Sequence, residues 1–290
     1  MRKFYIENIK GTRISLNGDS GIFLSEPTGL GLTLSSNYAD LNRGFFRTIG
    51  GESEPQATIV GDLVFIGKQP YEDYREFVNW CSATESLVLV YKPCGSTEFY
   101  RGICINYLTK TELTSTRWLV VPASFACTTP WYRAAPSHMS MSAETGNVLQ
   151  YPFAYSPTLS YSSSNAGSMA ADLSASGHIP AAFVFTYTGE IINPKLTLKG
   201  ATSGLVYGTC EIKLVLNQGE TLEISTKYGD SHATITDNKG HVKDALGLIN
   251  LEYEPFPKIP IDEDCTLYLS ADEDIRGTAM VRVFYYYRSV

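Results

Sequence analysis

Two acidic clusters are the residues of this sequence best suited to chemistry. They are Asp262-Glu263-Asp264 and Asp272-Glu273-Asp274, on either side of an apolar stretch over residues 265–269. Carboxylate oxygens are the ligands that Ca²⁺ prefers, but neither cluster has the glycine and the distal glutamate of an EF-hand loop. A glycosidase would hold two carboxylates about 5–10 Å apart in a cleft, and no motif in the sequence pairs them. We therefore expect two solvated turns, with no metal site and no catalytic carboxylate.

The histidines and cysteines also lack the spacing that catalysis or metal binding requires. No histidine has a Ser, Cys or carboxylate at triad-like spacing, and the G-x-S-x-G, H-E-x-x-H and Walker A motifs are absent. The cysteines form neither a C-x-x-C pair nor a zinc-ligand pattern, which favours buried thiols in a chain made in a reducing cytosol. We expect no enzyme activity and no cofactor. The residues concerned are His138, His178, His232, His241, Cys81, Cys94, Cys104, Cys127, Cys210 and Cys265.

The charge balance excludes two classes of partner and marks a domain boundary. The 290-residue chain has a formal net charge of −7, whereas general binding to nucleic acid or to an anionic membrane requires a basic face. Residues 1–133 hold 13 Lys/Arg and 13 Asp/Glu, so the remaining 10 and 17 lie in residues 134–290. No Lys or Arg occurs between Arg133 and Lys195. We therefore predict two domains, 1–133 and 134–290, with residues 134–179 partly a linker.

The sequence of the first domain predicts short β-strands around one helix. Phe4 and Ile6 alternate with polar residues, and Thr58 to Ile66 and Leu87 to Tyr91 are apolar runs of strand length. Between these two runs, the aromatic and apolar residues from Tyr71 to Cys81 recur at spacings of three and four, as on one face of an α-helix. We predict an amphipathic helix that starts at a proline and packs across a sheet.

The sequence of the second domain predicts β structure alone. From residue 179 onward, short runs of strand-forming residues are separated by turn signals such as Asn217-Gln218-Gly219 and Asp237 to Gly240. Many short strands with regular turns and no long helical pattern favour a β-sandwich or jelly roll. The expected fold class is therefore mainly β, with one short helix in the first domain.

Several segments taken together resemble the start of the siphophage distal tail proteins. In that family a strand, a short helix bearing Tyr, Phe and Trp, and another strand follow in this order. The resemblance covers residues 1 to about 130 and extends more loosely over the rest, through Gly189 to Asn193. The segments that carry it are Met1 to Asn8, Gly11 to Leu16, Pro27 to Leu32, Gly44 to Phe46, Gly61 to Phe65, Tyr71 to Trp80, and Leu87 to Pro93.

The resemblance implies a structural protein of the virion tail. Members of the family are similar in having a β-rich belt domain that assembles into a hexameric ring and a galectin-like β-sandwich that hangs from it. Such a ring joins the tail tube to the tail tip or baseplate hub and serves host attachment. The implied partners are further copies of the chain, the tail tube protein, a tail-tip or tail-associated lysin protein and a receptor-binding protein. No catalytic residue belongs to the family.

Phe45 and Phe46 are the residues that we expect at contacts between subunits. They precede the polar stretch Gly50 to Pro55, which is typical of a mobile loop or of the tip of a hairpin arm. The alternative is that both phenylalanines belong to the core of the first domain.

A carbohydrate- or receptor-binding module of a tail or tail-derived particle, such as one encoded by a prophage, is the alternative function. The chain contains 19 Tyr, whose rings could stack on sugars, but no Trp follows Trp131. The sequence has no secretory signal and no run of about 18 apolar residues. We therefore expect synthesis in the bacterial host cytoplasm and no membrane partner.

Overall fold

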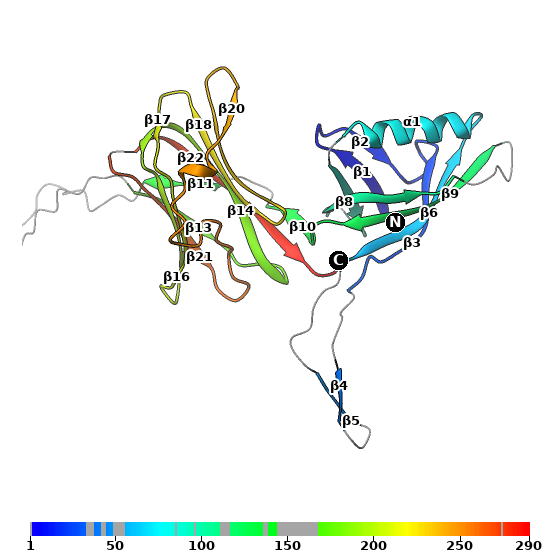
Figure 1. The fold of residues 1–290 in the computed structure, drawn as a ribbon, viewed down its shortest axis with the longest axis horizontal. Helices are drawn as coiled ribbons and strands as arrows, with labels where there is room; N and C mark the ends of the chain where they lie inside the picture. Colours follow the sequence, from blue (N-terminus) through cyan, green and yellow to red (C-terminus); the bar gives the residue numbers. More distant parts are fainter. Residues whose placement is uncertain are drawn as a thin grey trace, which may run out of the picture. The chain divides into compact units, whose positions relative to one another are not determined.

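The computed structural model describes residues 2–32, 38–41, 45–48, 56–84, 86–95, 97–110, 117–135, 139–143, 168–273 and 275–290. The chain divides into two compact units, Met1–Arg133 with Tyr287–Val290 and Ala134–Tyr286 (Figure 1). Strands dominate both units and the described residues include one α-helix, so the predicted mainly β fold class is confirmed. No helix in the described part of the chain is long and apolar enough to cross a membrane.

The first unit contains the α-helix and a set of mostly short strands. In chain order the elements are β1 (Lys3–Asn8), β2 (Arg13–Ser15), β3 (Ile22–Thr28), β4 (Tyr38–Leu41), β5 (Phe45–Thr48), β6 (Thr58–Ile66), α1 (Pro70–Ser82), β7 (Leu87–Lys92), β8 (Phe99–Leu108), β9 (Trp118–Cys127) and, where the chain leaves the unit, β10 (Trp131–Ala134).

The main sheet of the first unit closes on itself. Its strands pair antiparallel in the order β2-β1-β7-β8-β9-β6-β3. Leu16 connects the two ends, because its N–H donates to the Phe4 carbonyl at 2.9 Å and its carbonyl accepts from the Leu24 N–H at 3.1 Å. The Asn17 side chain also accepts from the Phe4 N–H at 2.8 Å and donates to the Phe4 carbonyl at 2.9 Å. Closure of this kind leaves few strand edges unpaired.

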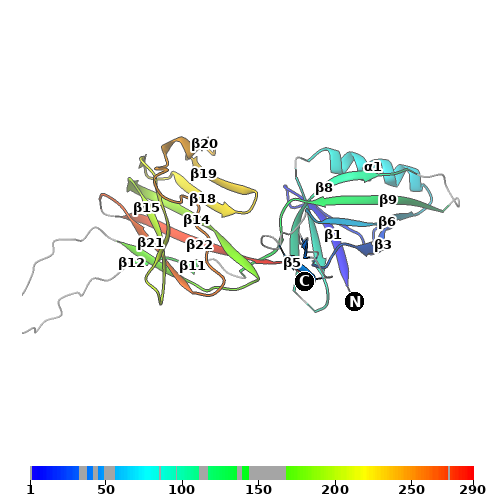
Figure 2. The ribbon, with the colours of Figure 1, turned by 60° about the horizontal axis from the view of Figure 1, so that its bottom comes forward.

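Helix α1 packs on this sheet, and the predicted helix is confirmed. Pro70 lies in the first turn, where a missing N–H costs no hydrogen bond. Phe77 is buried and meets Phe65 edge-on, with ring centroids 5.8 Å apart, and Tyr74 meets the same ring at 5.6 Å. Figures 1 and 2 show the helix on one side of the sheet, where it contacts β6 and β9.

The second unit consists of strands and one short 3₁₀ helix. In chain order the elements are β11 (Met139–Ser140), β12 (Ser142–Ala143), β13 (Met169–Leu173), β14 (Ile179–Ile192), β15 (Lys195–Gly200), β16 (Val206–Glu211), β17 (Val215–Leu216), β18 (Thr221–Lys227), β19 (Asp230–Thr236), β20 (Val242–Asp244), η1 (Leu246–Leu248), β21 (Cys265–Ser270) and β22 (Arg276–Tyr287).

These strands form two sheets that share one core. The first sheet has the order β22-β14-β18-β19-β20, with β11 on β22 and β17 on β14, and the second has the order β12-β13-β21-β15-β16. Alternate side chains, such as Phe183 and Phe185 of β14 and Leu196 and Leu198 of β15, fill the space between the sheets and are at most 3% exposed. This two-layered arrangement follows from the period-2 pattern of the sequence. The galectin-like or jelly-roll detail stays a prediction.

The residues from Cys210 to Leu216 alternate as one continuous strand would, but the structure divides them between two sheets. Strand β16 ends at Glu211 and pairs with β15, whereas β17 begins at Val215 and pairs with β14 in the other sheet. Between them the chain crosses from one sheet to the other, and the buried Ile212 donates its N–H to the Pro194 carbonyl at 3.0 Å. Alternation continues through the crossing, so the sequence pattern does not reveal the break.

The C-terminal residues of the chain pack with the first unit, and strands occupy part of the range 134–179. Residues Tyr287–Val290 belong to the first unit. Tyr287 packs edge-on against Phe99 with ring centroids 5.5 Å apart, and Val290 packs on the same core. Strands β11, β12 and β13 lie within the range 134–179 that was predicted as partly a linker, and residues 144–167 lie outside the described residues.

Candidate functional site

The first acidic cluster fixes loops of the second unit. Glu263 accepts hydrogen bonds from the Ser203 N–H at 2.5 Å, the Ser203 hydroxyl at 2.8 Å and the Tyr207 hydroxyl at 2.6 Å. These donors, the Ser203 N–H foremost, lower the pKa of Glu263 to about 2. Asp264 accepts a further hydrogen bond from the Ala175 N–H at 2.6 Å. The carboxylates of Glu263 and Asp264 therefore have structural partners of their own.

The second acidic cluster has a similar role where the structure describes it. The Asp272 carboxylate accepts from the Asn193 side chain at 2.7 Å, and the Asp272 N–H donates to the Ile192 carbonyl at 3.1 Å. Asp274 lies outside the described residues. Within the described ranges, no three His, Cys, Asp or Glu side chains are placed to hold a metal ion together.

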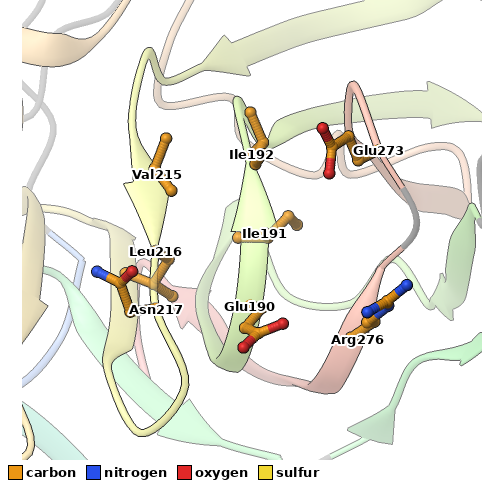
Figure 3. Close-up of a pocket in the computed structure, with 8 residues that line it drawn as sticks. All are labelled: Glu190, Ile191, Ile192, Val215, Leu216, Asn217, Glu273 and Arg276. Atoms are coloured by element: carbon orange, nitrogen blue, oxygen red, sulfur yellow. The ribbon is translucent and has the colours of Figure 1, made fainter.

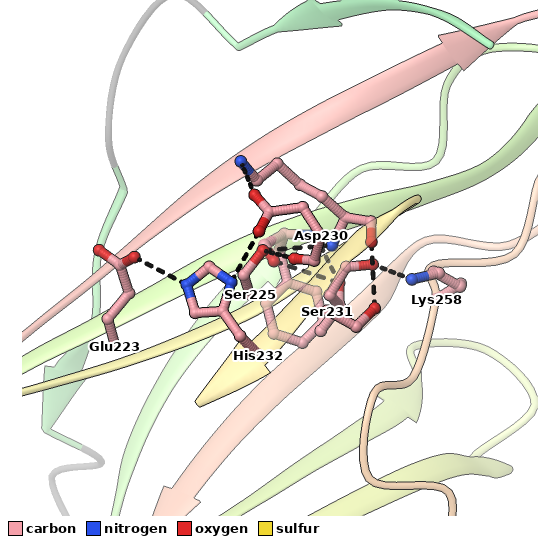
Figure 4. Close-up of polar contacts among 9 residues, drawn as sticks. Glu223, Ser225, Asp230, Ser231, His232 and Lys258 are labelled. Atoms are coloured by element: carbon pink, nitrogen blue, oxygen red, sulfur yellow. Dashed lines mark hydrogen bonds and ion pairs between the residues drawn. The ribbon is translucent and has the colours of Figure 1, made fainter. Parts of the chain in front are cut away.

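His232 lies in a polar network between β18 and β19 (Figure 4). Its Nε2 is 3.2 Å from Glu223 Oε1, and its Nδ1 is 2.9 Å from Asp230 Oδ1. The Ser225 hydroxyl donates to the Asp230 carbonyl at 2.7 Å, and the Ser231 hydroxyl donates to another backbone carbonyl at 3.0 Å. Both hydroxyls thus donate to the backbone rather than to the imidazole. A serine nucleophile that a histidine activates would need a hydrogen bond to that imidazole. The network ties two strands at their turn.

The other histidines have separate surroundings. His241 Nδ1 is 3.0 Å from Asp237 Oδ2 within one turn. The His178 N–H donates to the Tyr286 carbonyl at 2.8 Å, and His138 lies outside the described residues.

The cysteines are free thiols. Cys81, Cys127, Cys210 and Cys265 are buried, whereas Cys94 and Cys104 are exposed. Burial raises the pKa of Cys81 and that of Cys210 to about 12 each. Because the thiolate is the nucleophile and the metal ligand, thiols with such raised pKa values are unreactive at neutral pH.

Strands β4 and β5 carry the predicted contact residues and form a two-stranded sheet of their own. Phe46 pairs with Asp40 and Phe45 with Leu41, in antiparallel register. Neither strand pairs with any other strand of the described residues. A lone two-stranded hairpin is marginally stable in water, so this segment lacks the support that the other strands have. The polar stretch Gly50 to Pro55 lies outside the described residues.

A pocket of about 430 Å³ opens on the second unit between β14, β17 and the start of β22 (Figure 3). Glu190 ends the part of β14 that pairs with β22, and its partner in register is Arg276. No carboxylate of the described residues lies within 4.0 Å of the Arg276 guanidinium. The pocket is lined by Glu190, Ile191, Ile192, Val215, Leu216, Asn217, Glu273 and Arg276.

Of the charged residues in this pocket, sequence reasoning identified Glu273 as part of an acidic cluster and missed Glu190 and Arg276. The signal that could have found them is a glycine beside each residue, since Gly189 precedes Glu190 and Gly277 follows Arg276. A Cβ on Gly189 would lie 2.4 Å from the Arg276 carbonyl oxygen, and Gly189 has a φ of +136°. Glycine inside a strand pattern indicates this close approach of two backbones.

Comparison with known proteins adds a family and a fold. A family model for the N-terminal domain of the distal tail protein matches residues 3–128. No curated protein matches the chain. A chain of the phage P2 baseplate in its activated conformation with Ca has 16% identity and a TM-score of 0.68, with 100% of both chains covered. The SPP1 Dit (gp 19.1) protein, described as a paradigm of the hub adsorption apparatus in phages that infect Gram-positive bacteria, has 9% identity and a TM-score of 0.55, over 97% of this chain and 99% of that chain.

The two kinds of comparison support different statements. At these identities the solved structures show a shared fold, which extends over both units because nearly the whole chain is covered. The family model matches most of the first unit, over residues 3–128. Residues 3–128 therefore match the N-terminal domain family of distal tail proteins, in agreement with the resemblance seen in the sequence.

Proposed function

We propose that the chain is a structural protein of the phage tail that forms a hexameric ring between the tail tube and the tail tip or baseplate. The observation that carries this proposal is the match of residues 3–128 to the distal tail protein N-terminal domain. The fold shared with phage P2 baseplate and SPP1 Dit chains supports it. The partners are then other copies of the chain, the tail tube protein, and a tail-tip or receptor-binding protein.

The hairpin of β4 and β5 supports contact between copies. In the described residues its outer strand edges have no partner, whereas the main sheet of the first unit is closed. Unpaired N–H and C=O groups on a strand edge are a template for pairing with another chain. In a closed ring each copy offers one surface to the next copy and receives the opposite one. Phe45 and Phe46 would then add apolar area to the contact.

Native mass spectrometry of the full chain tests the ring. We expect a six-copy species that grows with protein concentration. Replacement of residues 38–48 by a Gly-Ser linker, or of both Phe45 and Phe46 by serine, should leave the monomer. Tyr253→Ser is the matched control, since Tyr253 is a 52% exposed aromatic residue of the second unit, and it should leave the hexamer intact. A monomer at every concentration, with and without the tail tube protein, would contradict the proposal.

A further inference from the structure

The pocket of Figure 3 presents both signs of charge around one opening. Glu190, Glu273 and Arg276 are all exposed, and their side chains make no hydrogen bond or ion pair with any described residue. Glu190 and Arg276 stand on paired strands and Glu273 on the loop that precedes β22, so the three surround the opening from two sides. Two acceptors and one donor group therefore remain available to a bound molecule.

This combination of charges selects the class of ligand. An anion would be attracted by Arg276 but repelled by the two carboxylates, and a cation would meet the reverse situation. A hydroxyl group is both donor and acceptor. Neighbouring hydroxyls on one neutral molecule can therefore donate to Glu190 and Glu273 while another accepts from Arg276.

The rest of the lining suits a molecule that also has an apolar face. Ile192 and Val215 stand at the side of the pocket, and Val215 is 62% exposed. Small-molecule sites combine apolar walls with a few convergent polar groups in about 300–1,000 Å³, and this pocket measures about 430 Å³. We propose that it binds a neutral saccharide, with ring hydroxyls on the charged groups and the C–H face of the ring on Ile192 and Val215.

The backbone beneath the pocket is fixed, which favours binding. The Tyr187 hydroxyl donates to the Glu190 carbonyl at 2.9 Å. Gly189 and Gly277 let β14 and β22 approach so closely that a Cβ on either would lie 2.4 Å from a carbonyl oxygen of the other strand. Glu190 and Arg276 therefore start from defined strand positions, and preorganisation lowers the entropy that binding must offset.

Saturation-transfer NMR on the full chain tests the proposal, with glucose, galactose, rhamnose and N-acetylglucosamine as the probes. We expect saturable binding of at least one of them. Arg276→Ala and Glu190→Gln should each weaken this binding about tenfold or more, because the first removes a charged donor and the second replaces a charged acceptor by a neutral amide. Lys195→Ala is the matched control, since Lys195 also stands opposite a carboxylate residue, Glu211, on a neighbouring strand. It should bind as the unchanged chain does.

Three results would overturn the proposal. They are no saturable binding of any of the four sugars, binding that survives both pocket variants, and resonances of the pocket that respond to calcium or inorganic phosphate in place of sugar. Urea unfolding of each variant verifies that the second unit is intact, and Glu190→Gln keeps the test decisive if Arg276→Ala does not fold. Native mass spectrometry tests the ring and the sugar resonances test the pocket, so either proposal can fail without the other.

Discussion

Replacing Thr226 by valine should destabilise the second unit by about 2–6 kcal/mol. Thr226 and Phe183 are buried, with exposed fractions of 0% and 1%. The Thr226 hydroxyl accepts from the Phe183 N–H at 2.9 Å and donates to the Phe183 carbonyl at 3.1 Å. The backbone pairing of β14 with β18 reaches only Val184 opposite Ser225, so this one side chain continues the ladder by a further position.

The magnitude follows from what valine leaves behind. Valine matches the shape of threonine, so the Phe183 N–H and carbonyl would stay buried without a partner on that side. Each such orphan costs about 1–3 kcal/mol. Thr226→Ser is the matched control, because it keeps both hydrogen bonds and loses only a methyl group, which costs about 1 kcal/mol.

Urea unfolding followed by two signals on the same sample measures this difference. All three tryptophans, Trp80, Trp118 and Trp131, lie in the first unit, so their fluorescence reports its transition, while far-ultraviolet circular dichroism reports both units. We expect Thr226→Val to lower the midpoint of the second unit alone and to speed hydrogen exchange at the Phe183 amide. If Thr226→Ser proves as destabilising as Thr226→Val, the reasoning from buried unpaired groups is refuted.

Three further outcomes are expected. Asn17→Ala should destabilise the first unit by about 1–3 kcal/mol, because it removes both side-chain bonds to Phe4, and an unchanged tryptophan transition in urea would count against this. Because the pKa of Glu263 is lowered, its ionised carboxylate stabilises the second unit above its ordinary pKa of about 4.5, and this stabilisation is lost as the pH falls towards 2. Glu263→Gln should flatten this acid dependence in thermal melts of the second unit, and an unaltered pH profile would contradict this expectation. Gly277→Ala would place a Cβ 2.4 Å from the Thr188 carbonyl oxygen and should cost about 1–3 kcal/mol or more; a wild-type midpoint in urea would show that the strands can separate.

The elements that are regular over many residues could be predicted from the sequence. The helix from Pro70 to Ser82 and the strand from Thr58 to Ile66 agree with the expected ranges within a residue or two. Both bury one regular face against their own unit, so local periodicity and tertiary burial give the same answer. The fold class of the chain follows from the same patterns.

Other features depend on which distant segments meet, and local pattern carries no such information. The crossing at Ile212 has the alternation of a strand, and only the partners of β16 and β17 separate it into two sheets. The Glu190–Arg276 pair joins residues far apart in the chain through β14 and β22. For the acidic clusters the sequence shows the carboxylates, but it does not show the donors that bind them, such as the Ser203 N–H on Glu263.

The packing of Tyr287 and Val290 against the core of the first unit affects the order of events during synthesis. A ribosome makes the chain from the N-terminus, and domains generally fold as they emerge. Here the N-terminal unit lacks two residues that pack against its core until the whole of the second unit has been translated. The second unit can therefore reach its final structure first, and the first unit is completed last. If assembly proceeds through the first unit, this order delays self-association until both units are present on each chain.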